Sequence, residues 1–136
     1  LYTSGSSGEP KGVVVSHRSL AAIGAAWCEA WQLAPGQTHL QMASAAFDVF
    51  TGDWVRALTS GGRLLICPRE TLLDPAALLA LWRAGGVDVA EFVPAVIRAV
   101  LDELDRTGAR LPPIELLIVG SDTWHRREYA RLQASA

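Results

Sequence analysis

The chain has 136 residues, is 50% hydrophobic and 19% charged, and carries a formal net charge of -2. A chain this apolar, with so little net charge, can bury enough surface to fold, which excludes an intrinsically disordered protein. The mildly acidic balance also argues against nucleic acid as the main partner, because binding to a phosphate backbone needs clustered Lys and Arg.

The first elements in chain order are expected to be two short strands, a long helix and a further strand. Residues 1–3 have the pattern of a strand, and the β-branched run 13–15 is typical of a strand buried on both faces. Ser16 is expected to cap a helix whose apolar residues recur at helical spacing and which stops before Pro35. Residues 40–43 follow as another strand.

The middle of the chain predicts two further helices, each followed by a strand. The first helix is expected over 49–58 and leads to a strand over 63–67. Asp74 followed by proline is a strong start signal for the second helix, and the Gly pair 85–86 ends it. The segment 87–92 then has the composition of a strand.

The C-terminal part continues the same alternation and defines the fold class. Pro94 opens a helix that ends at Gly108, residues 115–119 form a strand, and a last helix starts at about His125. Strands that alternate with helices predict an α/β fold, a mostly parallel sheet with helices on both faces. Such sheets bind ligands beyond the carboxyl ends of their strands. Three tryptophans on helical apolar stripes are expected in the core: Trp27, Trp31 and Trp82.

Residues 1–136 are expected to form a single partial domain, a piece of a longer protein. The chain starts inside a strand pattern, no Met precedes Leu1, and the last helical pattern stops after a few residues. Every apolar run is interrupted before it reaches the length of a membrane span, and no signal peptide precedes it. We therefore expect a cytoplasmic protein with no membrane partner.

Cysteine and histidine give no sign of a disulfide framework or a metal centre. Cys28 and Cys67 lie far apart, which excludes paired zinc-ligand spacing and is typical of a reducing compartment. His17, His39 and His125 are scattered without ligand spacing. No metal site is therefore predicted in these residues.

The segment 3–12, T-S-G-S-S-G-E-P-K-G, has the composition of a phosphate-binding loop. It contains four hydroxyl side chains, three glycines and one lysine. Glycines let the backbone N–H groups surround an anion, hydroxyls add neutral donors, and Lys11 supplies a point charge. A flexible linker, a tag-derived segment or an ordinary surface turn would have a similar composition. The segment is not a P-loop, because its lysine precedes Gly12 and no Ser or Thr follows to hold magnesium.

The longer stretch 3–20 resembles the phosphate-binding signature of adenylate-forming enzymes. This superfamily includes acyl-CoA synthetases, luciferases and the adenylation domains of nonribosomal peptide synthetases. Ser7 stands where the family usually has Thr and keeps the hydroxyl. The resemblance implies a loop that closes over the β- and γ-phosphates of ATP, with Lys11 as a catalytic residue. The implied phosphate-binding residues are Thr3, Ser4, Gly5, Ser6, Ser7, Gly8 and Lys11.

Within that family, the chain would be part of the large N-terminal domain. The small C-terminal domain and the acid that binds Mg²⁺ would lie beyond Ala136. We therefore expect the 136 residues alone to be catalytically inert.

Asp48 is an acid among aromatic and apolar neighbours, at the start of a predicted helix. From the residues alone, it can cap that helix and favour the positive end of its dipole. Alternatively it is buried, in which case it needs a counter-charge such as the ammonium group of a ligand. Both interpretations stay open on the residues alone.

The segment 47–54 resembles the second core motif of the peptide-synthetase branch, whose acid binds the α-amino group of the substrate. Acyl-CoA synthetases lack this acid. The resemblance therefore implies that the protein activates an amino acid and that Asp48 binds its α-amino group. Gly52 and Asp53 depart from the usual Trp and acid, which implies a different pocket wall. The implied substrate-binding residues are Phe47, Asp48, Val49, Gly52, Glu91, Leu117 and Val119, and the implied nucleotide-binding turn is Gly120, Ser121 and Asp122.

Glu91 lies in an apolar strand, directly before Phe92. It is either a strand-end acid that reaches water or, as the resemblance implies, the complement of a basic substrate side chain such as ornithine, lysine or arginine. Gly52 would leave room for such a long side chain.

The resemblance as a whole implies a ligase, the amino-acid adenylation domain of a nonribosomal peptide synthetase. It would use ATP to form an aminoacyl-AMP and pass the aminoacyl group to the phosphopantetheine thiol of a peptidyl carrier domain. Fragments of an acyl- or aryl-CoA synthetase and a non-catalytic nucleotide-binding module remain as alternatives.

Overall fold

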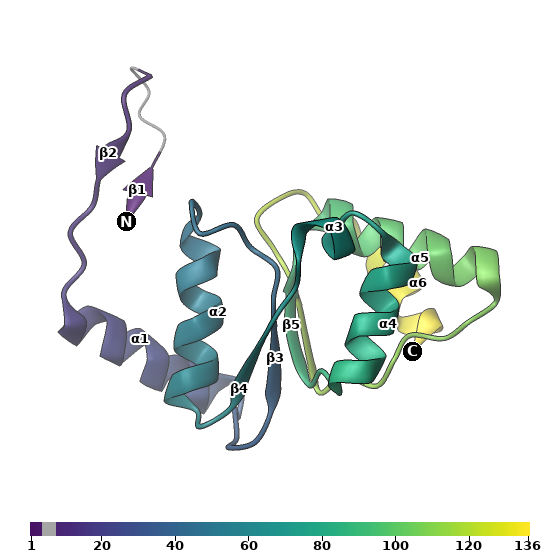
Figure 1. The fold of residues 1–136 in the computed structure, drawn as a ribbon, viewed down its shortest axis with the longest axis horizontal. Coiled ribbons are helices and arrows are strands. Elements are labelled where there is room, and N and C mark those ends of the chain that lie inside the picture. Colours follow the sequence, from purple (N-terminus) through teal and green to yellow (C-terminus); the bar gives the residue numbers. More distant parts are fainter. Residues whose placement is uncertain (4–7) are drawn as a thin grey trace.

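The computed structural model describes residues 1–3 and 8–136 and has a parallel β-sheet at its centre (Figure 1). The sheet has four strands in the order β4-β3-β5-β6, and every neighbouring pair is parallel. Their bounds are β3 (Thr38–Gln41), β4 (Arg63–Ile66), β5 (Val89–Phe92) and β6 (Leu116–Val119). A separate antiparallel hairpin of β1 (Tyr2–Thr3) and β2 (Lys11–Gly12) precedes them. The predicted α/β class with a parallel sheet is confirmed.

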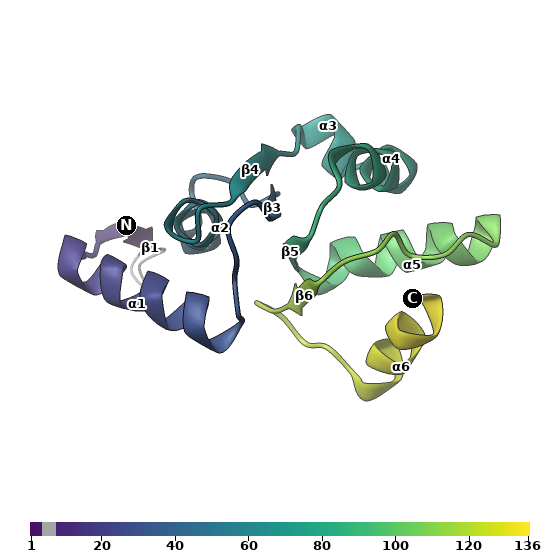
Figure 2. The ribbon, with the colours of Figure 1, turned by 90° about the horizontal axis from the view of Figure 1, so that it is seen from below.

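Helices cover both faces of the sheet, as predicted. Figure 2 shows α1 and α2 on one side of the strands and α4 and α5 on the other. The helices are α1 (His17–Ala30), α2 (Asp48–Thr59), α3 (Arg69–Leu72), α4 (Pro75–Gly85), α5 (Pro94–Thr107) and α6 (Arg126–Ser135). Within residues 1–3 and 8–136, none is long and apolar enough to cross a bilayer.

The strand order creates a switch point between β3 and β5. The chain leaves β3 for β4 on one side, whereas it leaves β5 for β6 on the other side. The two connections therefore diverge and leave a crevice above the carboxyl ends of β3 and β5. In open parallel sheets this crevice is the usual place for a ligand.

Local capping chemistry explains where the helices begin and end. The side chain of Ser16 caps α1 by accepting the backbone N–H three residues later. Asp74 Oδ1 accepts the backbone N–H groups of Ala76 and Ala77 at 3.0 and 3.1 Å. Gly86 ends α4 with a φ of 56°, a left-handed conformation that glycine adopts without a Cβ penalty. These ends agree with the sequence prediction.

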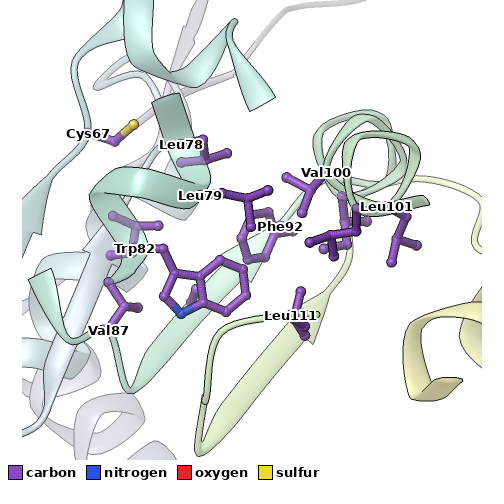
Figure 3. Close-up of a cluster of buried hydrophobic side chains, with 13 residues drawn as sticks. Cys67, Leu78, Leu79, Trp82, Val87, Phe92, Val100, Leu101 and Leu111 are labelled. Atoms are coloured by element: carbon purple, nitrogen blue, oxygen red, sulfur yellow. The ribbon is translucent and has the colours of Figure 1, made fainter. Parts of the chain in front are cut away.

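The hydrophobic core lies between the sheet and helices α4 and α5 (Figure 3). Trp82 is only 1% exposed, and its ring centroid lies 5.6 Å from that of Phe92. Trp27 and Trp31 are only half-buried and lie outside this cluster, so their predicted place in the core is wrong. The cluster comprises Leu40, Cys67, Leu78, Leu79, Trp82, Val87, Ala90, Phe92, Ile97, Val100, Leu101, Leu104 and Leu111.

The predicted buried strand at Val13–Val15 is also wrong. Only Val13 has a strand-like partner, because its N–H donates to the carbonyl of Leu1 at 2.7 Å. Val14 is 98% exposed, and the segment belongs to no strand of the central sheet. A run of three β-branched residues indicates extended backbone, but its burial depends on neighbouring strands that the run cannot specify.

Candidate functional site

Two adjoining cavities lie above the carboxyl ends of β3, β5 and β6, at the switch point of the sheet. Their volumes are about 440 and 490 Å³, within the range of small-molecule sites. Asp48, Val49, Glu91 and Ser121 line both cavities. The fold thus brings together four of the residues that the sequence singles out, from α2, β5 and the turn after β6.

The first cavity is walled mainly by apolar side chains. It lies between the segment after β3, the start of α2 and the start of α5. Phe47, a predicted substrate residue, lines it and is exposed. Its other lining residues are Met42, Ala43, Ser44, Leu72, Phe92, Val93 and Val96.

The second cavity lies between α1 and α2 and has a charged end. Gly52, another predicted substrate residue, lines it together with Arg56 and Glu91. The α1 wall consists of Ser19, Leu20, Ile23 and Trp27, and Leu1, Val15 and Thr51 complete the lining.

Asp48 is the first residue of α2, with an exposed side chain that faces the two cavities. Phe47 occupies the N-cap position, and no side-chain hydrogen bond caps the helix there. The capping interpretation is therefore wrong, and so is the alternative of a buried carboxylate, because the side chain is exposed. The acid does lie in the first turn of α2, at the positive end of the helix dipole, as the sequence predicts. Its role toward a substrate amine stays a prediction.

Asp53, Arg56 and Glu91 form a buried ionic cluster at the end of the second cavity. Arg56 Nη2 donates to Asp53 Oδ1 and to Glu91 Oε2, each at 2.7 Å. The exposed fraction is 4% for Arg56 and 17% for Glu91. Glu91 is thus paired and not directed to bulk water, because Arg56 of α2 donates a hydrogen bond to its carboxylate.

Two tryptophans hold the guanidinium from the α1 side. Arg56 Cζ lies 5.2 Å from the ring centroid of Trp27 and 5.5 Å from that of Trp31. The two rings are stacked, with centroids 6.0 Å apart and an interplanar angle of 11°. A cation over an aromatic face is stabilised by the ring quadrupole, so these tryptophans fix the position of Arg56.

The ionic cluster has two acids and one permanent cation. Burial raises the pKa of Asp53 from 3.8 to about 6, although Arg56 acts in the opposite direction. Counted by formal charge, two carboxylates and one guanidinium give the cluster a sum of -1, and the guanidinium keeps its proton. The second cavity therefore ends at a site that favours an additional cation.

The guanidinium of Arg56 lies directly beside Gly52. A Cβ on Gly52 would lie 3.0 Å from Arg56 Nη1, which is tighter than ordinary contact. The guanidinium therefore takes up part of the space that Gly52 leaves open, whereas Gly52 still lines the second cavity. Its role toward a long substrate side chain stays a prediction.

The two predicted residues of β6 lie on the other face of the sheet. Register pairs Glu91 with Ile118, and Ala90 and Phe92 with Leu117 and Val119. Because paired residues of parallel strands point to the same side, Leu117 and Val119 share the core-facing side. They pack against the core cluster and line neither of the two cavities, so their substrate role stays a prediction.

The turn after β6 approaches Glu91 from above. A Cβ on Gly120 would lie 3.8 Å from Glu91 Oε1, and Ser121 lines both cavities with a φ of 69°. A serine in the left-handed region is strained, which is typical of functional turns. Asp122 is exposed and accepts the backbone N–H of Thr123. The nucleotide contact expected of this turn stays a prediction.

The described ends of the predicted phosphate loop form the neck of a hairpin. Thr3 of β1 pairs with Lys11 of β2, both exposed, and Gly8 has a φ of 86°. Figure 1 shows this hairpin apart from the central sheet. Four further predicted residues lie outside the described residues: Ser4, Gly5, Ser6 and Ser7.

The sheet face toward α2 carries buried polar side chains, in contrast to the apolar face toward α4 and α5. His39 of β3 is buried, and among the described residues neither of its ring nitrogens has a hydrogen-bond partner. Burial lowers its pKa below 6.5, and Arg56 acts in the same direction while Asp88 opposes it. The imidazole is therefore held neutral.

Acidification is expected to destabilise the fold through His39. Because the folded-state pKa is lowered, the unfolded chain takes up the proton first, and stability falls as the pH drops below 6.5. Asp53 contributes with the opposite sign, since the folded state holds its proton more tightly up to about pH 6. We expect His39→Leu to lose less of its melting temperature than wild type between pH 7.5 and 5.5, as measured by circular dichroism. An equal loss in both proteins would contradict a neutral buried imidazole.

Within residues 1–3 and 8–136, no group of three His, Cys, Asp or Glu side chains could hold a metal ion.

Comparison with known proteins shows the family. The chain matches the AMP-binding enzyme family over residues 1–134 and belongs to that family. It is 40% identical over 135 residues to tyrocidine synthase 3 of Brevibacillus parabrevis, covering 98% of this chain and 2% of the synthase. It is 38% identical over 133 residues to gramicidin S synthase 2 of Brevibacillus brevis, covering 97% of this chain and 3% of that protein. The chain thus spans only a few per cent of the length of these relatives.

A solved structure of the nonribosomal peptide synthetase FmoA3, bound to α-methyl-L-serine-AMP, has the same fold. It superposes with a TM-score of 0.87 at 26% identity and covers 99% of this chain and 15% of that one. The predicted resemblance to peptide-synthetase adenylation domains is confirmed.

Sequence reasoning missed the cation of the site. Arg56 lies three residues after Asp53 in an otherwise apolar stretch, and that i,i+3 spacing of opposite charges was a usable signal. Trp27 and Trp31, four residues apart, present their rings on one side of α1, which suits a flat cation as well as a core. The pairing with Glu91 had no local signal, because 35 residues separate the two partners.

Proposed function

We propose that the protein containing this chain activates an amino acid as its adenylate. The substrate carboxylate attacks the α-phosphorus of ATP, the bond from that phosphorus to the β-phosphate oxygen breaks, and pyrophosphate leaves. The observation that carries the proposal is the pair of cavities at the switch point, lined by Asp48 and Glu91, in a member of the AMP-binding family. The adenylate-bound FmoA3 structure supports the same chemistry.

In this proposal the N-terminal loop binds the phosphate tail of ATP. Its hydroxyls and backbone N–H groups, with Lys11, neutralise the charge that builds on the departing pyrophosphate. Lys11 lies in β2, and its pairing with Thr3 brings the two ends of the loop together. The turn Gly120–Asp122 would contact the adenine side of the nucleotide.

The amino acid would lie between two acids. The carboxylate of Asp48 would accept hydrogen bonds from the α-ammonium group, an interaction strengthened by the charges of both partners. Glu91 belongs to a cluster of two acids and one guanidinium, and it would attract a cationic side chain. The proposed substrate therefore has a basic side chain, as in ornithine, lysine or arginine. Phe47, Val49 and Gly52 would complete its surroundings.

The similarity to gramicidin S synthase 2 and tyrocidine synthase 3 supports a second half-reaction in this proposal. The phosphopantetheine thiol of a peptidyl carrier domain would attack the aminoacyl carbonyl, form a thioester and release AMP. The two cysteines of this chain are free, which suits a reducing compartment, and we place the reaction in the cytoplasm.

Amino-acid-dependent exchange of labelled pyrophosphate into ATP tests the proposal. The whole protein, supplied with each amino acid in turn, is expected to show exchange with a basic amino acid above all others. Exchange with aryl or fatty acids only would assign the chain to the acyl-activating branch instead. The isolated 136 residues are expected to show none, and measurable adenylate formation by them would overturn that expectation.

A further inference from the structure

Glu91 would contact a substrate while one of its two carboxylate oxygens is bound by Arg56. One carboxylate oxygen, Oε2, accepts the guanidinium N–H at 2.7 Å. The other, Oε1, accepts no hydrogen bond from the described residues and lies near the turn at Gly120. Both Arg56 and Glu91 line the second cavity. A ligand cation that enters this cavity therefore finds one oxygen of Glu91 available and the other already used.

We infer that Arg56 is a positioning residue that selects short ammonium side chains, of the kind in ornithine or lysine, and rejects a guanidinium side chain. It holds Glu91 by one oxygen, so that the second oxygen faces the substrate, and it fills the end of the cavity that a substrate guanidinium would need. This inference rests on the proposed function and narrows its substrate class.

The surroundings of Arg56 show that its place is built rather than incidental. Trp27 and Trp31 lie against the guanidinium from α1, Asp53 binds it from its own helix, and Gly52 has no Cβ that would crowd it. A flexible surface arginine loses side-chain entropy to reach one geometry, whereas this one is 4% exposed and held on several sides. The guanidinium is therefore held in a fixed position at the end of the cavity and has little freedom to move away from a substrate.

The charge of the cluster favours any cation, whereas size and hydrogen-bond geometry discriminate between an ammonium and a guanidinium. A substrate cation at Oε1, ammonium or guanidinium, would offset the formal charge of -1 that two carboxylates and Arg56 give the cluster. A substrate guanidinium is larger and offers its paired N–H groups to two acceptor oxygens, one of which Arg56 already uses. Shortening Arg56 removes this competition and opens space next to both acids.

The test compares ornithine, lysine and arginine in pyrophosphate exchange by the whole protein and by Arg56→Ala. Wild type is expected to prefer ornithine or lysine. In Arg56→Ala, the ratio of kcat/KM for arginine to that for ornithine should rise about tenfold or more, in line with the discrimination that one side-chain-sized space provides. The KM for ATP should not change. Arg56→Lys, which restores the cation, should return the ratio toward wild type.

The matched control is Arg106→Ala, which removes a 70% exposed arginine paired with Glu103 on α5. It should leave the ratio at its wild-type value. An unchanged ratio in a folded Arg56→Ala protein, or a wild-type preference for arginine, would overturn the inference.

Removing Arg56 leaves two partly or fully buried acids without their cation, so the variant can fail to fold. Gly52→Ala then provides the second variant, because its Cβ would lie 3.0 Å from Arg56 Nη1, so that the guanidinium must shift by a few tenths of an ångström. We expect it to raise the KM for the basic amino acid and not that for ATP, and equal KM values in both proteins would overturn the inference. If the wild-type protein were inactive with every amino acid, the proposed function itself would be wrong. If the wild-type protein were active but the variants did not change the measured ratio or KM, only the role of Arg56 would be wrong.

Discussion

Asp48→Asn in the whole protein is expected to lower kcat/KM for the amino acid by about 100-fold or more. The substitution keeps the shape of the side chain and removes the charge that would meet the α-ammonium group, and charged hydrogen bonds of this kind contribute about 2–3 kcal/mol or more. Asp48 is exposed and accepts no capping bond, so its loss should not unfold the protein. Pyrophosphate exchange measures the rate, and circular dichroism measures the melting temperature.

Asp105→Asn is the matched control for Asp48→Asn. Asp105 lies near the end of α5 and lines neither cavity, is 65% exposed, and pairs with Arg131 at the surface. Its removal should leave exchange unchanged, since exposed ion pairs contribute little. Equal activity of Asp48→Asn and wild type would remove Asp48 from the substrate site and favour the acyl-activating branch.

Trp82→Ala is expected to lower the free energy of unfolding by about 3–5 kcal/mol, the range found for buried aromatic side chains. Trp82 of α4 is almost fully buried and packs against Phe92 of β5. Its indole N–H also donates to the carbonyl of Pro113, at 3.4 Å. Urea denaturation followed by circular dichroism measures the change without relying on tryptophan fluorescence.

Tyr129→Ala provides the comparison for Trp82→Ala. Tyr129 is also aromatic, but it lies on α6 with 53% of its surface exposed. We expect it to cost about 1 kcal/mol or less, as surface substitutions do. Similar losses for the two substitutions would mean that the cluster of Figure 3 does not support the sheet.

The two faces of the sheet differ in character, since one packs against the hydrophobic core and the other carries the charged groups of the candidate site. Toward α4 and α5, Leu40, Ala90 and Phe92 are buried in an apolar cluster. Toward α2, His39 and Glu91 meet Arg56 and other polar groups instead. The apolar face supplies rigidity, and the polar face keeps charges at low exposure, where electrostatic interactions are strong.

Most of the fold could be predicted because its signals are local. Asp74 with Pro75 and the Gly pair 85–86 mark both ends of α4, through hydrogen bonds and backbone geometry within a few residues. The valine run 13–15 failed for the opposite reason, since its burial depends on strands elsewhere. The short helix α3 was missed, because four residues are too few to show a period.

The site could be predicted in part, because a parallel sheet gathers its strand ends at one edge. This rule, together with the family resemblance, placed Asp48, Glu91 and Ser121 around the same cavities. Arg56 could not be found in this way, because its side chain crosses from α2 to β5 and only packing reveals the contact. The face on which Leu117 and Val119 lie depends on strand register, which sequence alone does not determine.

The most direct measurement is a crystal structure of the whole protein with a non-hydrolysable analogue of ornithyl-AMP. We predict that the α-ammonium nitrogen lies within hydrogen-bond distance of the Asp48 carboxylate and that the side-chain nitrogen lies beside Glu91 Oε1. An analogue bound elsewhere, or bound at these cavities with Asp48 turned to bulk solvent, would contradict the account.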